Sequence, residues 1–255
     1  MAPYTAVLLA GSRPGGDPLS RSLGTDCKPL LPIRGEPMVL RPLEALLAAP
    51  SVGEVLVLTQ EVDRLSDVIP IGERVRVQPS GATIAATLSA LLTDPGTRFP
   101  LLVTTADNAL LTPAMAEEFI AAAEGCDLAI GVVSRASMLR RFPDAQRTWL
   151  RFGGERYSGA NLFALNTPAA AVGIERWRSI EQDRKKGWRV LLQMGWPLFL
   201  GAVLRVRDLH GTARAFSRTL GINLRGVVMS DPLAAIDVDK PADYELVSAI
   251  LDGRA

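Results

Sequence analysis

The chain has 255 residues, of which 48% are hydrophobic and 22% are charged, and its formal net charge at pH 7 is +1. This composition is typical of a globular protein with a sizeable core, and the near-neutral charge argues against nucleic acid as the main partner. Two distant cysteines, Cys27 and Cys126, argue against a disulfide scaffold or a zinc site. A single histidine, His210, leaves little room for a histidine triad.

The first apolar run, Tyr4 to Ala10, predicts a buried parallel strand, because it is short and ends at a glycine. No positively charged segment precedes it and no small-residue cleavage pattern follows it, so we interpret it as a strand rather than a signal peptide. No stretch reaches the roughly 18 apolar residues of a membrane span. We therefore expect a cytoplasmic protein.

The segment Gly11 to Asp26 is a long, glycine-rich and basic loop directly after this strand. Glycines there allow backbone N–H groups to approach phosphate oxygens, and Arg13 adds positive charge. Neither a Walker motif nor a dinucleotide fingerprint is present. Glycine content alone fits a phosphate-binding loop and a flexible surface loop equally well.

Strands and helices alternate through the first 133 residues, which predicts an α/β protein with a Rossmann-like, mixed and mostly parallel sheet and helices on both faces. Pro37 is expected at the first position of a helix over Met38 to Leu47. The other expected strands are Glu54–Thr59, Val75–Gln78, Phe99–Thr105 and Asp127–Val133, and the other expected helices are Ala82–Leu92 and one from Thr112-Pro113 to Ala123.

The pattern changes after Ser134, where two strands are joined by a turn-rich segment over residues 153–159. We predict one domain over residues 1–255, with a first half over residues 1–133, an inserted lid region over 134–234 and a return to the core over 235–255. The expected elements of this half are strands Thr148–Phe152, Ala160–Leu165, Leu224–Met229 and Ala235–Val238, and helices after Pro168, over Thr212–Leu220 and over Ala242–Leu251.

Three aspartates lie where strands are expected to end. Asp107 follows the fourth strand, at the sheet edge where ligands bind in open α/β folds. Asp237 and Asp239 alternate along one expected strand and would share a face. We expect Asp239 to cap the last helix and Asp237 to be the freer ligand. A carboxylate pair of this kind suffices for Mg²⁺, which takes its remaining ligands from phosphates and water.

Several motifs together resemble the MobA-like and sugar-phosphate nucleotidyltransferase superfamily. Leu8-Leu9-Ala10-Gly11 and Lys28-Pro29-Leu30-Leu31-Pro32 resemble its opening, and Thr105-Ala106-Asp107 resembles its metal-binding segment. Gln78-Pro79-Ser80-Gly81 resembles the turn that reads the nucleobase, and Tyr157-Ser158-Gly159-Ala160-Asn161 resembles the strand near the acceptor. Asp237-Val238-Asp239-Lys240-Pro241 resembles a late signature. Two departures from the family pattern are an early Arg13, with Arg21 as the alternative phosphate contact, and Asn108 after the aspartate.

The resemblance implies a single nucleotidyltransferase domain, in which residues 1–133 bind the nucleotide and residues 134–234 bind the acceptor. It also implies the roles of individual residues. Catalysis would rest on Arg13, Lys28 and Asp107, and the acceptor would contact Ser158 and Asn161. The metal would be Mg²⁺ on Asp107, Asp237 and Asp239. The nucleotide would be bound by Leu9, Ala10, Gly11, Ser12, Arg13, Lys28, Gln78, Gly81 and Thr83.

The resemblance also implies the reaction, in which a nucleoside monophosphate moves from an NTP, with CTP preferred, to a small phosphorylated polyol, sugar or amino alcohol. Pyrophosphate leaves. One alternative is a molybdenum-cofactor guanylyltransferase, and another is a non-catalytic nucleotide-binding regulator.

The apolar segment Trp188 to Leu209 carries interspersed arginines. It fits a homodimer contact or a cover over the acceptor site better than an amphipathic helix on a membrane surface.

Overall fold

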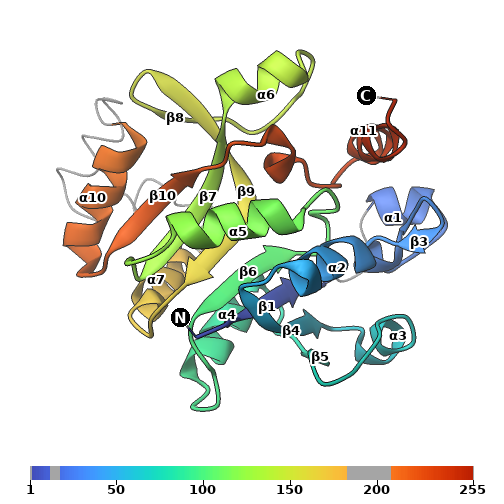
Figure 1. The fold of residues 1–255 in the computed structure, drawn as a ribbon, viewed down its shortest axis with the longest axis horizontal. Helices are drawn as coiled ribbons and strands as arrows, with labels where there is room; N and C mark the ends of the chain where they lie inside the picture. Colours follow the sequence, from blue (N-terminus) through green and yellow to red (C-terminus); the bar gives the residue numbers. More distant parts are fainter. Residues whose placement is uncertain (1, 12–17, 183–207, 255) are drawn as a thin grey trace.

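The structure is a computed structural model that describes residues 2–11, 18–182 and 208–254. An eight-stranded sheet forms its centre, in the order β10-β7-β9-β6-β1-β4-β5 with β8 paired to β9 (Figure 1). Only β9 runs antiparallel to its neighbours β6, β7 and β8 among these strands. The predicted mixed, mostly parallel sheet is confirmed. Its strands are β1 (Tyr4–Leu9), β4 (Val52–Thr59), β5 (Val75–Pro79), β6 (Leu101–Thr105), β7 (Leu128–Ser134), β8 (Leu150–Phe152), β9 (Glu155–Leu165) and β10 (Leu224–Val228).

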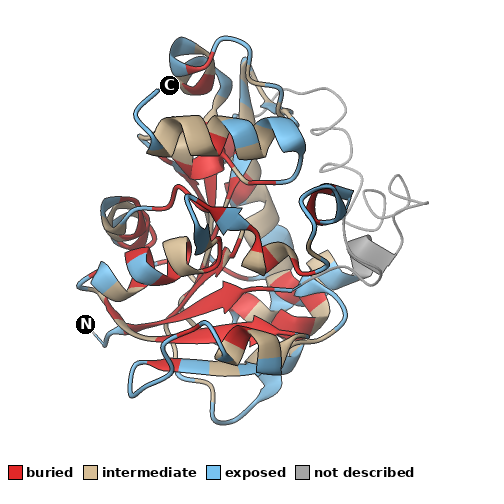
Figure 2. Cartoon of the chain, turned by 90° about the vertical axis from the view of Figure 1, so that its right-hand side faces the viewer, coloured by how far each residue is buried: buried red, intermediate tan, exposed pale blue. Residues whose placement is uncertain are grey.

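Helices cover both faces of this sheet. Successive side chains of a strand point to opposite faces, and the strands carry apolar side chains on both, so each face is buried under helices. In β1, Ala6 and Leu8 belong to one buried cluster, whereas Val7 and Leu9 belong to the other. The buried strands between the two helical layers are visible in Figure 2. The first cluster includes residues of α2 (Leu40–Ala48), α5 (Pro113–Ala122) and α11 (Pro241–Leu251), and the second includes residues of α4 (Ile84–Thr93) and α7 (Ala170–Gln182).

Helix α10 (Leu209–Leu220) packs against β10, where Gly226 makes room for it. A Cβ atom on Gly226 would lie 2.9 Å from Cγ of Leu209, so a larger residue would push the helix away. None of the helices in the described part of the chain combines the length and the apolar character needed to cross a bilayer.

Short elements complete the carboxyl edge of the sheet, and the periodicity of the sequence did not reveal them. They include α1 (Pro18–Ser22), which lies within the segment expected to be a loop, and the 3-10 helix η1 (Lys28–Leu30). The others are β2 (Pro32–Ile33), β3 (Glu36–Pro37), α3 (Val62–Ser66), α6 (Arg135–Arg141) and the 3-10 helix η3 (Pro232–Ala235).

Three expectations about individual elements are wrong. Pro37 does not begin a helix, because it pairs with Pro32 in the β2–β3 hairpin and α2 starts only at Leu40. The hairpin turn places both Arg34 and Gly35 at positive φ, as the favoured two-residue turns require. Strand β9 begins at Glu155, inside the segment read as a turn. Residues 235–238 form the end of η3 and an irregular segment instead of a strand.

Candidate active site

The candidate site lies at the edge of the sheet where β1 and β6 end. These strands are parallel and adjacent, so Ala10 and Asp107 leave the sheet side by side. The N–H of Ala106 donates to the carbonyl oxygen of Leu9 at 2.9 Å, which extends the pairing to the last residues before the site. This is the edge at which ligands bind in open α/β sheets.

Lys28 is held at this edge by a rigid, proline-containing segment. Its neighbours Cys27, Pro29 and Leu31 are buried. The carbonyl oxygens of Pro29 and Leu31 accept hydrogen bonds from Val39 and Met38, at 2.9 and 2.8 Å. The Lys28 backbone is therefore fixed by the packing of its neighbours.

The ammonium group of Lys28 bridges two carboxylates that are distant in sequence. Its Nζ lies 2.6 Å from Oδ2 of Asp107 and 2.6 Å from Oδ1 of Asp239. The hydroxyl of Thr105 donates to the other oxygen of Asp107 at 2.5 Å. The N–H of Val238 donates to the Asp107 carbonyl oxygen at 3.0 Å, so backbone pairing also joins the two acidic segments.

Burial and charge act against each other on Lys28. Burial disfavours the charged ammonium, but the negative charges of Asp107 and Asp239 outweigh it and hold the pKa of Lys28 above its ordinary value. Lys28 is therefore a permanent cation at neutral pH.

A second cation, Arg147, organises the late aspartate segment. Its guanidinium lies 2.7 Å from Asp237 and 3.2 Å from Asp243. The expected capping role of Asp239 is wrong, because Asp243 is the side chain that accepts from the N–H groups of Asp239 and Lys240 where α11 begins. Asp239 instead faces Lys28, and Asp237 is ion-paired. Arg147 lies in an irregular segment with no motif around it, and the sequence did not single it out.

Asp237 lies near two other carboxylates in addition to its partner Arg147. Burial, followed by the nearby carboxylates of Asp107 and Asp239, raises the pKa of Asp237, and Arg147 opposes this shift. The amide of Asn161 on β9 donates to Asp237 over 3.4 Å. Asp107, Asp237 and Asp239, which the sequence predicted as metal ligands, are therefore gathered in one acidic cluster together with Asn161.

The predicted acceptor residues lie on β9 beside an irregularity in the strand pairing. Ser158 is buried opposite Val133 of β7. Asn161 has a positive φ of 49°, which is uncommon outside glycine. The buried Asn108 donates to the carbonyl oxygen of Ala160 at 3.3 Å, and its Oδ1 has no hydrogen-bond partner in the described part of the chain. This residue, a departure from the family pattern, supports the strand that carries Asn161.

The expected nucleobase turn is closed by side chains. The amide of Gln60 donates to the carbonyl oxygen of Gly81 at 2.8 Å, and the N–H of Gly81 donates to Thr87 at 3.0 Å. Thr83 caps α4 by accepting from Ala86. A Cβ atom on Gly11 would lie 3.0 Å from the Gln60 side chain, so Gln60 contacts both glycine turns. Sequence reasoning did not identify Gln60, whereas Gln78 is exposed at the end of β5.

Some predicted residues cannot be placed. Ser12 and Arg13 lie outside the described residues, as does all of the apolar segment 188–209 except Asp208 and Leu209. Arg21, the alternative phosphate contact, lies in the last turn of α1 at the same edge of the sheet.

The acidic cluster offers two carboxylates to a metal ion. No three His, Cys, Asp or Glu side chains form a ready-made metal-binding group among the residues that the structure describes. Asp107 and Asp239 nevertheless share one cation, the Lys28 ammonium, at 2.6 Å each. Two carboxylates of this kind fit a Mg²⁺ ion that completes its ligands with substrate phosphates and water.

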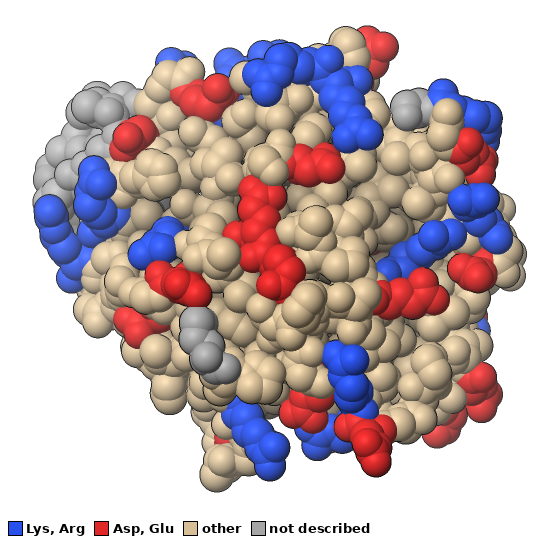
Figure 3. Space-filling view, viewed as in Figure 1, with Lys and Arg blue, Asp and Glu red and all other residues tan. Residues whose placement is uncertain are grey.

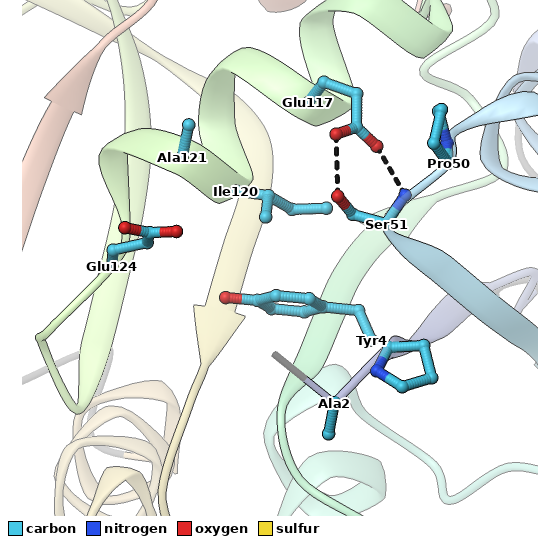
Figure 4. Close-up of a pocket in the computed structure, with 9 residues that line it drawn as sticks. Ala2, Tyr4, Pro50, Ser51, Glu117, Ile120, Ala121 and Glu124 are labelled. Carbon is cyan, nitrogen blue, oxygen red and sulfur yellow. Dashed lines mark hydrogen bonds between the residues drawn. The ribbon is translucent and has the colours of Figure 1, made fainter.

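Elsewhere the charged groups are more exposed, as in the ion pairs of Arg64 with Asp26 and Glu61 at 2.7 and 3.9 Å. In Figure 3, acidic and basic side chains are mixed, with basic groups above α6 and an acidic stripe over α5. A shallow cavity of about 310 Å³ lies at the opposite end of β1, beside Tyr4, Glu117 and Glu124 (Figure 4). Ser51 donates to Glu117 there through its N–H and its hydroxyl, at 2.8 and 2.7 Å.

Solved structures with the same architecture define the class of the fold. A hypothetical transferase from Thermus thermophilus is 25% identical, with a TM-score of 0.79 over 95% of this chain and 99% of that one. Two others have TM-scores of 0.61. They are 4-diphosphocytidyl-2C-methyl-D-erythritol synthase from Anaerococcus prevotii (9% identical, 98% and 97% covered) and CMP:2-keto-3-deoxy-manno-octonic acid synthetase complexed with CTP (15% identical, 99% and 100% covered). The fold is that of the nucleotide-diphospho-sugar transferases.

The family is given by sequence. The model of the MobA-like NTP transferase domain matches residues 6–207, and the chain therefore belongs to the MobA-like NTP transferase family. It is a nucleotidyltransferase, which confirms the class of enzyme predicted from the motifs. No curated protein matches the sequence.

Proposed function

We propose that the protein transfers a nucleoside monophosphate from an NTP, with CTP preferred, to a small phosphorylated polyol, sugar or amino alcohol in a Mg²⁺-dependent reaction. The observation that carries this proposal is the bridge from Lys28 to Asp107 and Asp239 at the carboxyl edge of the sheet. It combines a fixed cation for phosphates with a carboxylate pair suited to Mg²⁺. The cytidine nucleotides named in two of the fold neighbours accord with CTP as donor.

In the reaction, an oxygen of the acceptor phosphate forms a bond to the α-phosphorus, and the bond from the α-phosphorus to the β-phosphate oxygen breaks. Pyrophosphate leaves with that electron pair. The acceptor phosphate is already anionic near pH 7, so no general base is needed. Catalysis then depends on positioning and charge neutralisation, as expected for phosphoryl chemistry.

Each residue has a proposed task in this scheme. Two of the three N–H groups of Lys28 serve the carboxylates, and the third can donate to a triphosphate oxygen. Asp107 and Asp239 would hold Mg²⁺, which when bound neutralises charge on the reacting phosphates. Arg13 would add charge to the triphosphate side, Gln78, Gly81 and Thr83 would bind the nucleobase side, and Ser158 and Asn161 would orient the acceptor.

Two measurements test the proposal. A thermal-shift screen of the four NTPs with Mg²⁺ should raise the melting temperature most for one nucleotide, because binding to the folded state stabilises it. Pyrophosphate release should then require that NTP, Mg²⁺ and a phosphorylated acceptor. Release only with GTP and molybdopterin would favour the guanylyltransferase. Binding without release across a panel of acceptors would favour a regulator.

A further inference from the structure

Arg147 is a nearly buried cation without a place in the reaction described above. It lies between α6 and β8, in a segment without regular structure, yet only 9% of its side chain is exposed. A guanidinium so enclosed requires carboxylate partners, because desolvating it without them is costly. It has two, Asp237 and Asp243, which come from opposite ends of one short segment.

These contacts brace the segment that carries Asp239. Oδ1 of Asp243 faces Arg147 at 3.2 Å, and its Oδ2 accepts from the N–H groups of Asp239 and Lys240 at 3.2 and 3.1 Å. Asp237 is held from the other side at 2.7 Å. Residues 236–239 have no strand partner, so Arg147 supplies much of the order that a sheet would otherwise give.

The charges of this region favour a divalent cation. Among the described residues, the four carboxylates of Asp107, Asp237, Asp239 and Asp243 are ion-paired with two cations, Lys28 and Arg147. The formal balance, four negative charges against two positive ones, leaves an excess of two negative charges. Each cation faces two carboxylates, so one negative charge stays uncompensated on each side. The side chain of Asp239 is 48% exposed and that of Asp237 is 28% exposed, so an added cation reaches the Asp107 and Asp239 side more readily.

We propose that Arg147 is a positioning residue that keeps Asp237 in an ion pair and thereby makes Asp239 the partner of Asp107 in binding a divalent cation. The role of that cation in catalysis rests on the proposed function, but the choice between the two aspartates does not. Without Arg147, Asp237 would be released and could bind the cation in place of Asp239.

The experiment measures Mn²⁺ binding to the full-length protein, without nucleotide, by electron paramagnetic resonance of the free ion. In the wild-type background, Asp239→Asn should weaken Mn²⁺ binding about tenfold, and Asp237→Asn should change it much less. In an Arg147→Met background, the two substitutions should have similar effects. Arg141→Met, which removes a surface arginine ion-paired to Asp231, is the control. In this background Asp239→Asn should still weaken Mn²⁺ binding more than Asp237→Asn does.

Equal losses from Asp237→Asn and Asp239→Asn in the wild-type background would overturn the proposal, even if Arg147→Met does not fold. So would an unchanged order in a folded Arg147→Met protein, or no Mn²⁺ binding by the wild-type chain at millimolar concentration. These results are independent of turnover. If Asp239→Asn weakens Mn²⁺ binding more than Asp237→Asn does, but no pyrophosphate is released in the activity assay, the proposed reaction is rejected and the role of Arg147 is kept.

Discussion

Two cations of this molecule each bridge a pair of aspartates, but they lie in different environments. The Lys28 bridge is the more open one, since the side chain of Asp239 is 48% exposed, whereas the Arg147 bridge joins a 9% exposed guanidinium to the 28% exposed Asp237 and the 15% exposed Asp243. An open pair can exchange its cation for phosphates and metal more readily than a closed one. The proposed function therefore gives the open bridge to ligand binding and the closed bridge to the architecture of the acidic segment.

The largest expected effect concerns the open bridge. Asp107→Ala should lower kcat by about 10³-fold, because charge on the reacting phosphates loses its compensation. The melting temperature should change little, since an alanine keeps the backbone carbonyl oxygen that accepts from the N–H of Val238. Pyrophosphate release and thermal unfolding measure the two quantities. Full activity in a folded variant would remove Asp107 from the site.

The closed bridge should show the reverse pattern. Arg147→Met should lower the free energy of unfolding by about 3 kcal/mol, because two partly buried carboxylates lose their partner. Lys28→Met should cost less, since water reaches Asp239. Chemical denaturation of both variants makes the comparison. A larger loss for Lys28→Met would mean that the open bridge is the structural one.

Lys28→Ala should lower kcat/KM by about 10²-fold, through loss of a preorganised donor to the triphosphate. Steady-state kinetics with the preferred NTP measure this effect. Arg64→Ala is a matched control, since it removes another cation that is ion-paired to an aspartate, Asp26, but on the exposed surface. An unchanged kcat/KM in Lys28→Ala would assign Lys28 to structure alone.

The smallest effects are expected from two helix caps, of which one lies at the proposed nucleotide side. Thr83 and Thr112 each accept a hydrogen bond from a backbone N–H in the first turn of α4 and α5. Thr83→Ala and Thr112→Ala should each cost about 1 kcal/mol of stability. Only Thr83→Ala should also raise KM for the NTP. Equal KM values in both variants would take Thr83 out of the nucleotide site.

The sequence by itself determined the alternating α/β pattern, the strand that precedes Asp107 and the helix that begins after Thr112, which the structure confirms. These features depend on local periodicity and on short-range hydrogen bonds, which a single segment encodes. The motifs also identified Lys28 and the three aspartates of the cluster. The family match confirms the resemblance that those motifs suggested.

Tertiary structure alone decided how the charges are paired. Lys28 and Asp239 are 211 positions apart, and Arg147 and Asp237 are 90 apart, so no local pattern links them. Two aspartates of one motif acquired different surroundings, because Asp239 faces a lysine at an open edge and Asp237 faces an arginine that is only 9% exposed. The physical reason is desolvation, which depends on what the whole fold packs around each charge.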